Sequence, residues 1–230
     1  MPPLPRILIT GATRGLGTHI AAALAPDHHL LIGGRDRAAA ERCAAQWPSA
    51  EPFVADLTDA DQIRAAVAET IGAGPLDAVV HNAGITRNGT VAELETDAWR
   101  TQFEVNLFSV VELTRQLLPS LRQAKGMVLT INSGAGFRSS PGNASYSATK
   151  WALRAFTTAL REEERPLGVR VTSIHPGRVD TDMQRQIQQS RGADYDPADH
   201  MNGADVAATV RLALTMPHSA TIEELSVRPT

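Results

Sequence analysis

Apolar and polar positions alternate along this chain with two different periods. Short runs of β-branched and other apolar residues are separated by longer stretches with apolar residues at helical spacing. The longer stretches predict amphipathic helices. The short runs predict seven strands: Ile7 to Thr10, Leu30 to Ile32, Pro52 to Ala55, Ala78 to His81, Met127 to Ile131, Val169 to Ile174 and Glu224 to Val227.

The order of these elements predicts how the strands pair. A strand, a helix and a second strand in succession place the two strands in parallel, because the crossover has to return over the sheet. The repeated order predicts an α/β fold of the Rossmann type, with a doubly wound, seven-stranded parallel sheet and helices on both faces. Proline and glycine mark the segment boundaries, and no long linker separates two halves. We therefore expect a single domain over residues 1–230, a length sufficient for one buried core.

One connection is longer and more polar than the others. Residues 180–202 lie between a predicted strand and the next helical pattern, and they are rich in Gln, Arg, Asp and Gly. Long connections in compact domains are often active-site lids, so we predict a substrate lid there. A mobile surface insertion would have the same composition.

Composition excludes several classes of partner. The 22 basic and 25 acidic residues nearly balance, so we expect no nucleic-acid partner. The segment Met1 to Arg6 lacks the apolar core of a signal peptide, and no stretch approaches the roughly 18 apolar residues of a spanning helix. We expect a cytoplasmic protein without a membrane partner. The single cysteine, Cys43, predicts a buried, inert thiol. The histidines lack the paired spacing of a zinc helix, so we predict no catalytic metal.

A glycine-rich turn follows the first predicted strand directly. A glycine permits the sharp turn after the strand, and two more let a helix begin close to a bound phosphate. The exposed amides and the positive end of the dipole at a helix N-terminus favour such an anion. The spacing Gly-x-x-x-Gly-x-Gly differs from the commoner Gly-x-Gly-x-x-Gly, and a plain tight turn is the alternative interpretation. The predicted nucleotide-binding residues of this turn are Gly11, Thr13, Arg14, Gly15, Leu16 and Gly17.

The end of the second strand bears on cofactor choice. An acidic residue at this point would bind the ribose hydroxyls of NAD. Here Gly34 leaves room, and Arg35 could pair with the additional 2′-phosphate of NADP, with Arg14 closing on the same group. Asp36 could instead take the ribose if the strand ended later, or the three charged residues that follow Gly34 could form a solvated turn. We favour NADP(H) over NAD(H).

The ends of the third and fourth strands complete the predicted cofactor site. In an open α/β fold, the carboxyl ends of the strands form the edge at which the ligand binds. Asp56 and Leu57 follow the third strand, and Asn82, Ala83 and Gly84 follow the fourth. We predict that they contact the cofactor, with the adenine near Asp56.

An acid/base pair lies further along the chain. Tyr146 and Lys150 are four residues apart in the helical pattern Ala144 to Arg161, so their side chains share one face. A phenol has a pKa of about 10, and a neighbouring ammonium would stabilise the phenolate and lower that pKa. Tyr146 could then exchange a proton with a carbonyl or alcohol oxygen, which Ser133 would hold by hydrogen bonding. The alternative interpretation is an exposed Tyr and Lys pair with Ser133 in a turn.

In this order, the motifs identify a resemblance to the classical short-chain dehydrogenase/reductase family over essentially the whole chain. The glycine-rich turn, Asn82-Ala83-Gly84 and the Ser133, Tyr146, Lys150 set match that family's pattern, although His81 replaces the usual Asn. The resemblance implies a catalytic tetrad of Asn106, Ser133, Tyr146 and Lys150, in which Asn106 positions a proton-relaying water. It also implies that Tyr146 and Lys150 contact the cofactor, together with Pro176, Gly177, Val179 and Thr181 near the nicotinamide.

The resulting prediction is an NADP(H)-dependent oxidoreductase. It would transfer hydride between the nicotinamide and a small carbonyl or secondary alcohol substrate, with Tyr146 as general acid/base. The resemblance implies a homodimer or homotetramer. Arg138, Arg178, Arg185 and Arg191 could recognise a substrate carboxylate. The alternative function is a non-catalytic NADP(H)-sensing regulatory protein of the same fold, although a sensor has no chemical need for the acid/base pair.

Overall fold

The computed structural model describes residues 3–190 and 194–230. Seven strands lie in this described part: β1 (Arg6–Ile9), β2 (His29–Gly34), β3 (Ala50–Val54), β4 (Ala78–His81), β5 (Met127–Ile131), β6 (Arg170–Pro176) and β7 (Glu224–Val227). Its α-helices are α1 (Leu16–Leu24), α2 (Arg37–Ala44), α3 (Ala60–Thr70), α4 (Thr96–Phe103), α5 (Ser109–Ala124), α6 (Ala144–Glu164), α7 (Asp182–Ser190) and α8 (Gly203–Thr215). The π-helical turn η1 (Glu104–Phe108) joins α4 to α5, and three 3₁₀ turns are η2 (Gly134–Gly136), η3 (Arg165–Leu167) and η4 (Pro197–Asp199).

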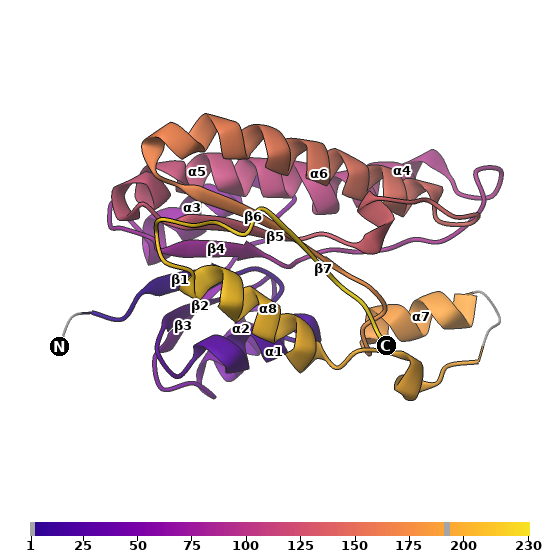
Figure 1. Cartoon of the computed structure of the whole chain (residues 1–230), viewed down its shortest axis with the longest axis horizontal. Coiled ribbons are helices and arrows are strands. Elements are labelled where there is room, and N and C mark those ends of the chain that lie inside the picture. The colour runs from indigo at the N-terminus through magenta and orange to yellow at the C-terminus, as the bar shows by residue number, and fades with distance from the viewer. Residues whose placement is uncertain (1–2, 191–193) are drawn as a thin grey trace.

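The strands form one parallel sheet. Within the described residues its order is β3-β2-β1-β4-β5-β6-β7, and every neighbouring pair is parallel. The predicted Rossmann-type fold is therefore confirmed, with α3, α5 and α6 on one face and α1, α2 and α8 on the other (Figure 1). The predicted strand Leu30 to Ile32 was too short, because the pairing of β2 with β1 and β3 extends from His29 to Gly34.

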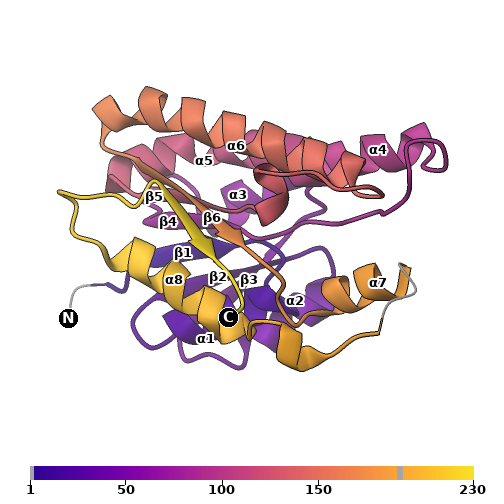
Figure 2. The same ribbon diagram turned by 45° about the vertical axis from the view of Figure 1, so that its right-hand side comes forward.

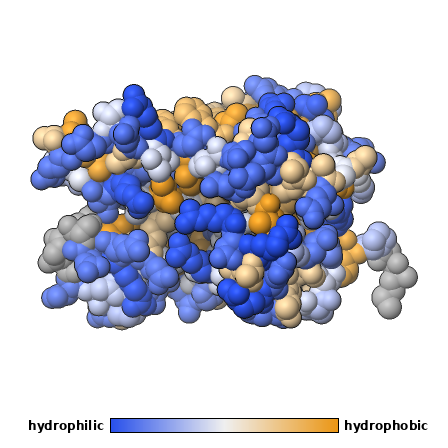
Figure 3. All heavy atoms as spheres, turned by 180° about the vertical axis from the view of Figure 1, so that it is seen from behind, coloured by the Kyte–Doolittle hydropathy of each residue, from blue (hydrophilic) through white to orange (hydrophobic). Residues whose placement is uncertain are grey.

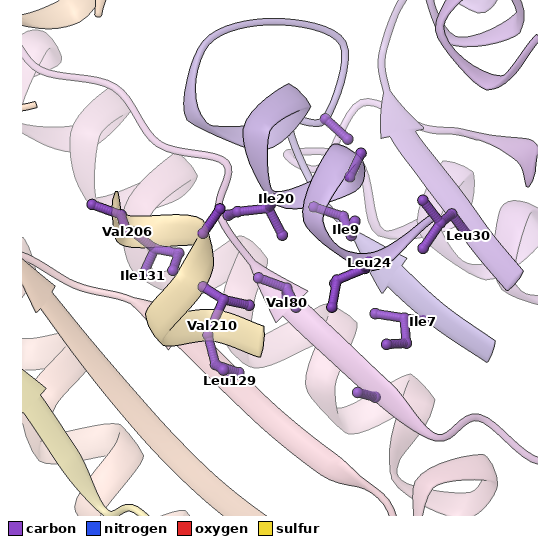
Figure 4. Packing of buried hydrophobic residues seen from close by; sticks show 14 of the residues in the cluster. Ile7, Ile9, Ile20, Leu24, Leu30, Val80, Leu129, Ile131, Val206 and Val210 are labelled. Carbon is purple, nitrogen blue, oxygen red and sulfur yellow. The ribbon is translucent and has the colours of Figure 1, made fainter. Parts of the chain in front are cut away.

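Strand residues alternate between two hydrophobic cores. Along β1, Ile7 and Ile9 belong to one cluster and Leu8 to the other, as the period of two in a strand requires. The first cluster joins the sheet to α1 and α8, and Figure 4 shows Ile20 and Val210 from these helices beside the strands. The second cluster joins the opposite face to α3, α5 and α6. Burial on both faces explains why the strands are almost continuously apolar.

Several helices begin at a side chain that caps their exposed amides. The Asp36 carboxylate accepts from the Ala39 amide at the start of α2 at 2.9 Å. At the start of α8, the Asn202 side chain and the Asp205 carboxylate form a reciprocal capping box. A cap that satisfies an otherwise unpaired donor contributes about 1 kcal/mol, so these short polar residues fix where each helix begins.

The carboxyl ends of the strands all lie at one edge of the sheet. At the centre of this edge β1 lies beside β4, where the strand order reverses. Figures 1 and 2 both show α4 and α7 at this end of the molecule, on opposite sides of the sheet. A parallel sheet thus brings to one place loops that are far apart in the sequence, and the reversal point is where such folds bind ligands.

Two other features of the chain bear on the sequence predictions. Cys43 is buried on α2, and its thiol lies 3.4 Å from the Ala12 carbonyl oxygen, as expected of an inert structural thiol. In the described part of the chain, no helix has the length and apolar character needed to cross a membrane.

Candidate active site

The glycine-rich turn between β1 and α1 has the backbone that its sequence predicts. Gly11 has φ +62° and Gly15 has φ +56°, a left-handed conformation that side chains disfavour. A Cβ on Gly17 would lie 2.7 Å from Ala12 Cα, because α1 begins tightly against the turn. Each of the three glycines is therefore required by conformation or by packing.

The fourth strand holds this turn in place. The Thr10 hydroxyl accepts hydrogen bonds from the amides of Asn82 and Ala83, both at 3.0 Å. In return, the Asn82 side-chain amide donates to the carbonyl oxygens of Thr10 at 3.0 Å and Gly11 at 3.1 Å. The two predicted motifs thus form one hydrogen-bonded unit at the reversal point of the sheet.

The start of α1 suits a phosphate group. Gly15 occupies the cap position, where no side chain of the described residues accepts from the first amides, and the first turn, which opens with Leu16, holds no acidic residue. The Arg14 side chain is exposed beside them. Uncapped amides, the helix dipole and a left-handed glycine that leaves the approach open together fit a pyrophosphate.

The end of β2 settles how Asp36 is used. Its carboxylate caps α2, which disfavours the alternative that it binds a ribose. Gly34 lies against Thr13, whose Cγ2 would be 2.8 Å from a Cβ on the glycine. The Arg35 side chain is exposed and makes no hydrogen bond or ion pair with the rest of the described chain.

The residues after β3 lie close to Arg35. The Asp56 carboxylate accepts from the Thr58 amide at 2.9 Å and hydroxyl at 2.8 Å, and these two bonds hold its pKa below the usual range. The charge of Arg35 lowers the same pKa further. Leu57 packs against the core between α3 and α5. The structure therefore groups Arg35, Asp56 and Leu57 at one side of the glycine-rich turn.

The acid/base residues meet between β5 and α6. Ser133 follows β5 and opens η2, where its hydroxyl accepts from the Ala135 amide at 3.1 Å. Tyr146 and Lys150 lie one turn apart on α6, with the Lys150 ammonium 5.6 Å from the centre of the Tyr146 ring. Lys150 is 4% exposed, and its ammonium donates to the Ile131 carbonyl at 3.1 Å. Tyr and Lys are thus not an exposed surface pair.

Burial dominates the ionisation of both residues. It raises the pKa of Tyr146 above its usual 10, and a hydrogen bond with the Ser133 side chain opposes this only in part. It lowers the pKa of Lys150 from 10.5 to about 8. The sequence-based expectation of a lowered Tyr146 pKa is therefore wrong for the protein without a bound ligand, because desolvation of the phenolate outweighs the hydrogen bond with Ser133.

Asn106 lies in η1, beneath the acid/base residues. Its side chain binds the amide and carbonyl of Ile85 at 2.8 and 2.9 Å and donates to the Thr149 hydroxyl at 3.1 Å. Both amide hydrogens are thereby used. A water held by this residue would have to bind another of its atoms. π-Helical turns inside α-helices are often found at functional sites, and η1 separates α4 from α5 here.

Sequence reasoning overlooked three buried polar residues that touch this site. Asn132 donates to the Lys150 carbonyl at 3.2 Å, and the His175 ring lies 3.1 Å from the Ser133 carbonyl oxygen. Gln102 donates to the Ser145 hydroxyl beside the acid/base pair at 2.6 Å. For Gln102 the signal was present, since it lies four residues before Asn106 in a helical pattern.

The segment after β6 runs along the same edge. Pro176 ends β6, and the Gly177 amide donates to the Val227 carbonyl at 2.7 Å. Val179 is buried and bridges to Met201. The Thr181 hydroxyl accepts from the Gln184 amide at 3.3 Å at the start of α7.

The predicted lid, residues 180–202, begins and ends at the bridge between Val179 and Met201. Asp180 accepts from Arg185 and from the Tyr195 hydroxyl, both at 2.6 Å. Arg185 is therefore already paired and is a poor candidate for substrate recognition. Arg191, a second candidate, lies outside the described residues. The lid itself stays a prediction.

Seen from the opposite side, the molecule is hollowed between the part that carries α4 and the part that carries α7, with hydrophobic residues inside the hollow (Figure 3). The strand ends that carry the site residues face this end of the molecule. The arrangement can bind a nucleotide across the glycine-rich turn and exchange a proton at Tyr146. In the described part of the chain, no cluster of three or more His, Cys, Asp or Glu side chains could hold a metal ion.

Comparison with known proteins gives consistent matches. A family model described as short chain dehydrogenase matches residues 5–192. An uncharacterised oxidoreductase of Staphylococcus epidermidis is 31% identical over 228 residues, which cover 96% of each chain. An alcohol dehydrogenase of the archaeon Thermococcus sibiricus, complexed with 5-hydroxy-NADP, is 28% identical with a TM-score of 0.88, and 99% of this chain and 97% of that chain are covered. A 3-oxoacyl acyl-carrier-protein reductase of Brucella melitensis with bound NAD is 31% identical with a TM-score of 0.84, covering 99% and 91%.

Proposed function

The chain belongs to the short-chain dehydrogenase family, and on that premise we propose that it is an NADP(H)-dependent oxidoreductase of small carbonyl compounds and secondary alcohols. One observation carries the proposal. Tyr146, buried Lys150 and Ser133 are packed together at the same sheet edge as a glycine-rich turn whose helix start suits a pyrophosphate. A nucleotide-binding turn and a proton donor at one edge are what hydride transfer to a carbonyl requires.

Tyr146 is the proposed general acid. Because its pKa lies above 10, the phenol carries its proton at neutral pH and can donate it to a carbonyl oxygen. Ser133 would hold the same oxygen by a hydrogen bond. When bound, the nicotinamide supplies the hydride to the carbonyl carbon. A protonated Tyr146 favours reduction of a carbonyl over oxidation of an alcohol near neutral pH.

Lys150 has two proposed tasks. Its buried ammonium, beside the phenol ring, favours the phenolate that remains after proton donation. It would also hold the nicotinamide ribose. Asn106 would position the turn of α6 that carries Lys150, through its hydrogen bond with Thr149. Val179 and Thr181 are proposed to lie at the nicotinamide, because they follow Pro176 and Gly177 at the carboxyl end of β6.

The preference for NADP(H) is proposed from the end of β2. Gly34 places no side chain at this point and lies against Thr13, Arg35 is exposed and unpaired within the described chain, and the Asp36 carboxylate is engaged as a helix cap. A guanidinium can bind a 2′-phosphate through two hydrogen bonds, whereas the nearby carboxylate already accepts from the Ala39 amide and is turned to the start of α2. Arg14 lies on the adjoining turn and would bind the same phosphate.

The substrate and the assembly are further parts of the proposal. Arg138 and Arg178 are exposed after η2 and β6, without partner side chains in the described part of the chain, which supports a substrate bearing a carboxylate or another anionic group. A homodimer or homotetramer is supported by exposed apolar side chains at the end of η1 and on α6. Phe108 is 53% exposed and Trp151 is 48% exposed, so Trp151 is not a core residue of the single chain.

The test is oxidation of NADPH and NADH, followed by absorbance, against ketones, aldehydes, diketones and 3-oxo acids. The Tyr146→Phe variant should lose at least about a hundredfold in kcat and retain NADPH affinity, because only the hydroxyl that donates the proton is removed. Tyr195→Phe, the same change at the only other tyrosine, should lose far less. Full activity of Tyr146→Phe would contradict the assignment. Tight NADPH binding without turnover of any substrate would favour the regulatory alternative.

The cofactor preference has its own test. Arg35→Ser should raise the KM for NADPH about tenfold or more and leave the KM for NADH nearly unchanged, because only the 2′-phosphate contact is lost. Arg37→Ser is the matched control, since Arg37 is exposed two residues further along, at the start of α2, and pairs with Glu41 at 3.7 Å. Equal effects of Arg35→Ser on both cofactors would refute the proposed selectivity.

A further inference from the structure

Two fully buried carboxamides lie one helical turn apart beneath the acid/base residues. Gln102 on α4 is 0% exposed, and Asn106 in η1 is 1% exposed. Residues four apart on a helix project from the same face, so both side chains point toward α6. A buried carboxamide must place two N–H donors and one carbonyl acceptor, and its partners therefore show what it holds together.

The two amides make the same set of hydrogen bonds. Asn106 accepts from the Ile85 amide, donates to the Ile85 carbonyl and donates to the Thr149 hydroxyl. Gln102 accepts from the Arg87 amide at 2.9 Å, donates to the Arg87 carbonyl at 3.3 Å and donates to a hydroxyl on α6 at 2.6 Å. Each amide thus clamps one backbone unit of the loop after β4 and one hydroxyl of α6.

The two clamps are in register with the acid/base residues. Ile85 and Arg87 are two apart, the period of an extended chain, and the two hydroxyls on α6 are four apart, the period of a helix. The Asn106 clamp ends at Thr149, next to Lys150, whereas the Gln102 clamp ends at Ser145. The extended segment is therefore fastened to the helix turn that carries the acid/base pair at both ends of that turn.

Gln102 is connected to Tyr146 most directly through Ser145. Ser145 precedes Tyr146 in the chain, and its hydroxyl accepts the short bond from Gln102. The carbonyl of Tyr146 accepts from Thr149, the residue that the Asn106 clamp reaches. With both clamps formed, the backbone on either side of Tyr146 is fixed to the wall of the site.

We propose that Gln102 is a positioning residue for Tyr146, which holds the half-buried phenol in place through Ser145 and the Arg87 backbone. The inference rests on the proposed function for its role in turnover, but the placement of Tyr146 can be tested without turnover. Gln102 touches neither a reacting atom nor the cofactor site by any hydrogen bond of the described structure, so it acts through Ser145.

The first test compares steady-state constants of matched variants. Gln102→Met keeps the length of the side chain and removes its three hydrogen bonds, whereas Ser145→Ala removes only the bond to α6. Gln116→Met is the control, because Gln116 lies on α5 and bonds to Glu112 and the Ala60 carbonyl, away from the site.

We expect kcat of Gln102→Met to fall about tenfold while the KM for cofactor changes by less than about twofold. The double variant with Ser145→Ala should lose no more than Gln102→Met alone, because the two changes break the same bond. A purely structural role would lower the active fraction and leave the pH profile of kcat unchanged. Unchanged kcat, or strictly additive losses, would overturn the inference.

The second test measures the pKa of Tyr146 itself. The chain holds two tyrosines, so in a Tyr195→Phe background the ultraviolet difference spectrum of tyrosinate reports Tyr146 alone. Burial raises the pKa of Tyr146. Loosening the turn admits water to the phenol, so Gln102→Met should lower that pKa toward 10, and Gln116→Met should not.

The two tests separate the inference from the proposed function. If the parent protein turns over no substrate, the proposed function fails, and the titration alone decides whether Gln102 holds Tyr146 in place. An unchanged Tyr146 pKa in Gln102→Met would overturn the inference whatever the kinetics show. Circular dichroism across the titration establishes that each variant stays folded. If the fold of Gln102→Met is lost, the milder Ser145→Ala variant carries the comparison, with a smaller shift in the same direction.

Discussion

Lys150 offers the most direct prediction about stability, because its ammonium is buried without a carboxylate partner in the described structure. Its contacts are one carbonyl oxygen and the face of the Tyr146 ring. Burial lowers its pKa from 10.5 to about 8. The folded protein therefore holds this proton less tightly than the unfolded chain does, and the charged lysine destabilises the fold.

The magnitude follows from the two pKa values. Lowering the Lys150 pKa from 10.5 to about 8 corresponds to about 3 kcal/mol of lost unfolding free energy below pH 8, at 1.36 kcal/mol per pKa unit. Lys150→Met replaces the ammonium with an apolar side chain of similar length. It also leaves the Ile131 carbonyl without this donor, which costs about 1 kcal/mol. We expect Lys150→Met to be more stable by about 2 kcal/mol at neutral pH, and inactive.

The pH dependence has a defined sign. Between pH 8 and 10.5 the unfolded chain binds the Lys150 proton and the folded protein has released it, so the unfolding free energy of the parent protein rises with pH in that window. The unfolding free energy of Lys150→Met does not show this rise with pH. The stability advantage of the variant should therefore be greatest below pH 8 and vanish before the pH reaches 10.5, where only the cost of about 1 kcal/mol for the lost hydrogen bond is left.

Urea denaturation of the parent, Lys150→Met and Lys125→Met at several pH values provides the measurement. Lys125 is the only other lysine in the chain and is exposed, so its substitution controls for loss of one positive charge. The reasoning is refuted if Lys150→Met is no more stable than the parent at neutral pH, or if both proteins gain stability equally between pH 8 and 10.5.

Three further predictions concern stability and cofactor binding. Arg122→Ala should lower the unfolding free energy in urea by about 3 kcal/mol, because Glu164, whose side chain is 3% exposed, would lose bonds of 2.9 and 2.6 Å and stay buried as a charge. Gly17→Ala should lower the melting temperature and abolish nucleotide binding in a titration, because its Cβ would collide with the backbone of the turn. A Cβ on Gly15 would meet no neighbouring atom, so Gly15→Ala should cost only the strain of its positive-φ backbone, about 1–3 kcal/mol. His81→Gln should remove part of the acid sensitivity. Burial lowers the His81 pKa from 6.5 to about 3, so the unfolded chain alone takes up this proton as the pH falls between those values, and the parent protein should lose about 2 kcal/mol more than the variant between neutral pH and about pH 5.

Each of these predictions has a result that would contradict it. Arg115→Ala breaks an exposed pair with Glu112 and should cost less than about 1 kcal/mol of unfolding free energy. If Arg122→Ala cost no more than this, burial of the Glu164 carboxylate would not be what makes its ion pair important. Equal losses for the two glycine variants would show that packing against the turn is unimportant. Parallel stability curves in acid for His81→Gln and the parent would mean that the folded protein binds this proton as readily as the unfolded chain does.

The sequence was most informative where a property depends on neighbours along the chain. The seven strands and their parallel pairing followed from apolar runs that alternate with helical patterns, and the structure confirms both within the described residues, whereas the order of the strands in the sheet came from the structure. The glycine-rich turn was identifiable because only glycine accommodates the left-handed backbone of Gly11 and Gly15. The spacing of Tyr146 and Lys150 placed both on one helix face, since a helical turn brings residues four apart together. The single domain and the lid remain predictions.

Tertiary structure alone decided the depth of burial and the long-range hydrogen bonds. The Tyr146 pKa is raised rather than lowered because the packing of α6 against the sheet removes water from the phenol, and no local pattern records how complete that removal is. The helix cap formed by Asp36 depended on where α2 begins. The bond between Gln102 and Ser145 joins residues 43 positions apart. Periodicity along the chain predicts which face of a helix is buried, but only the packing of distant segments decides which polar groups meet there.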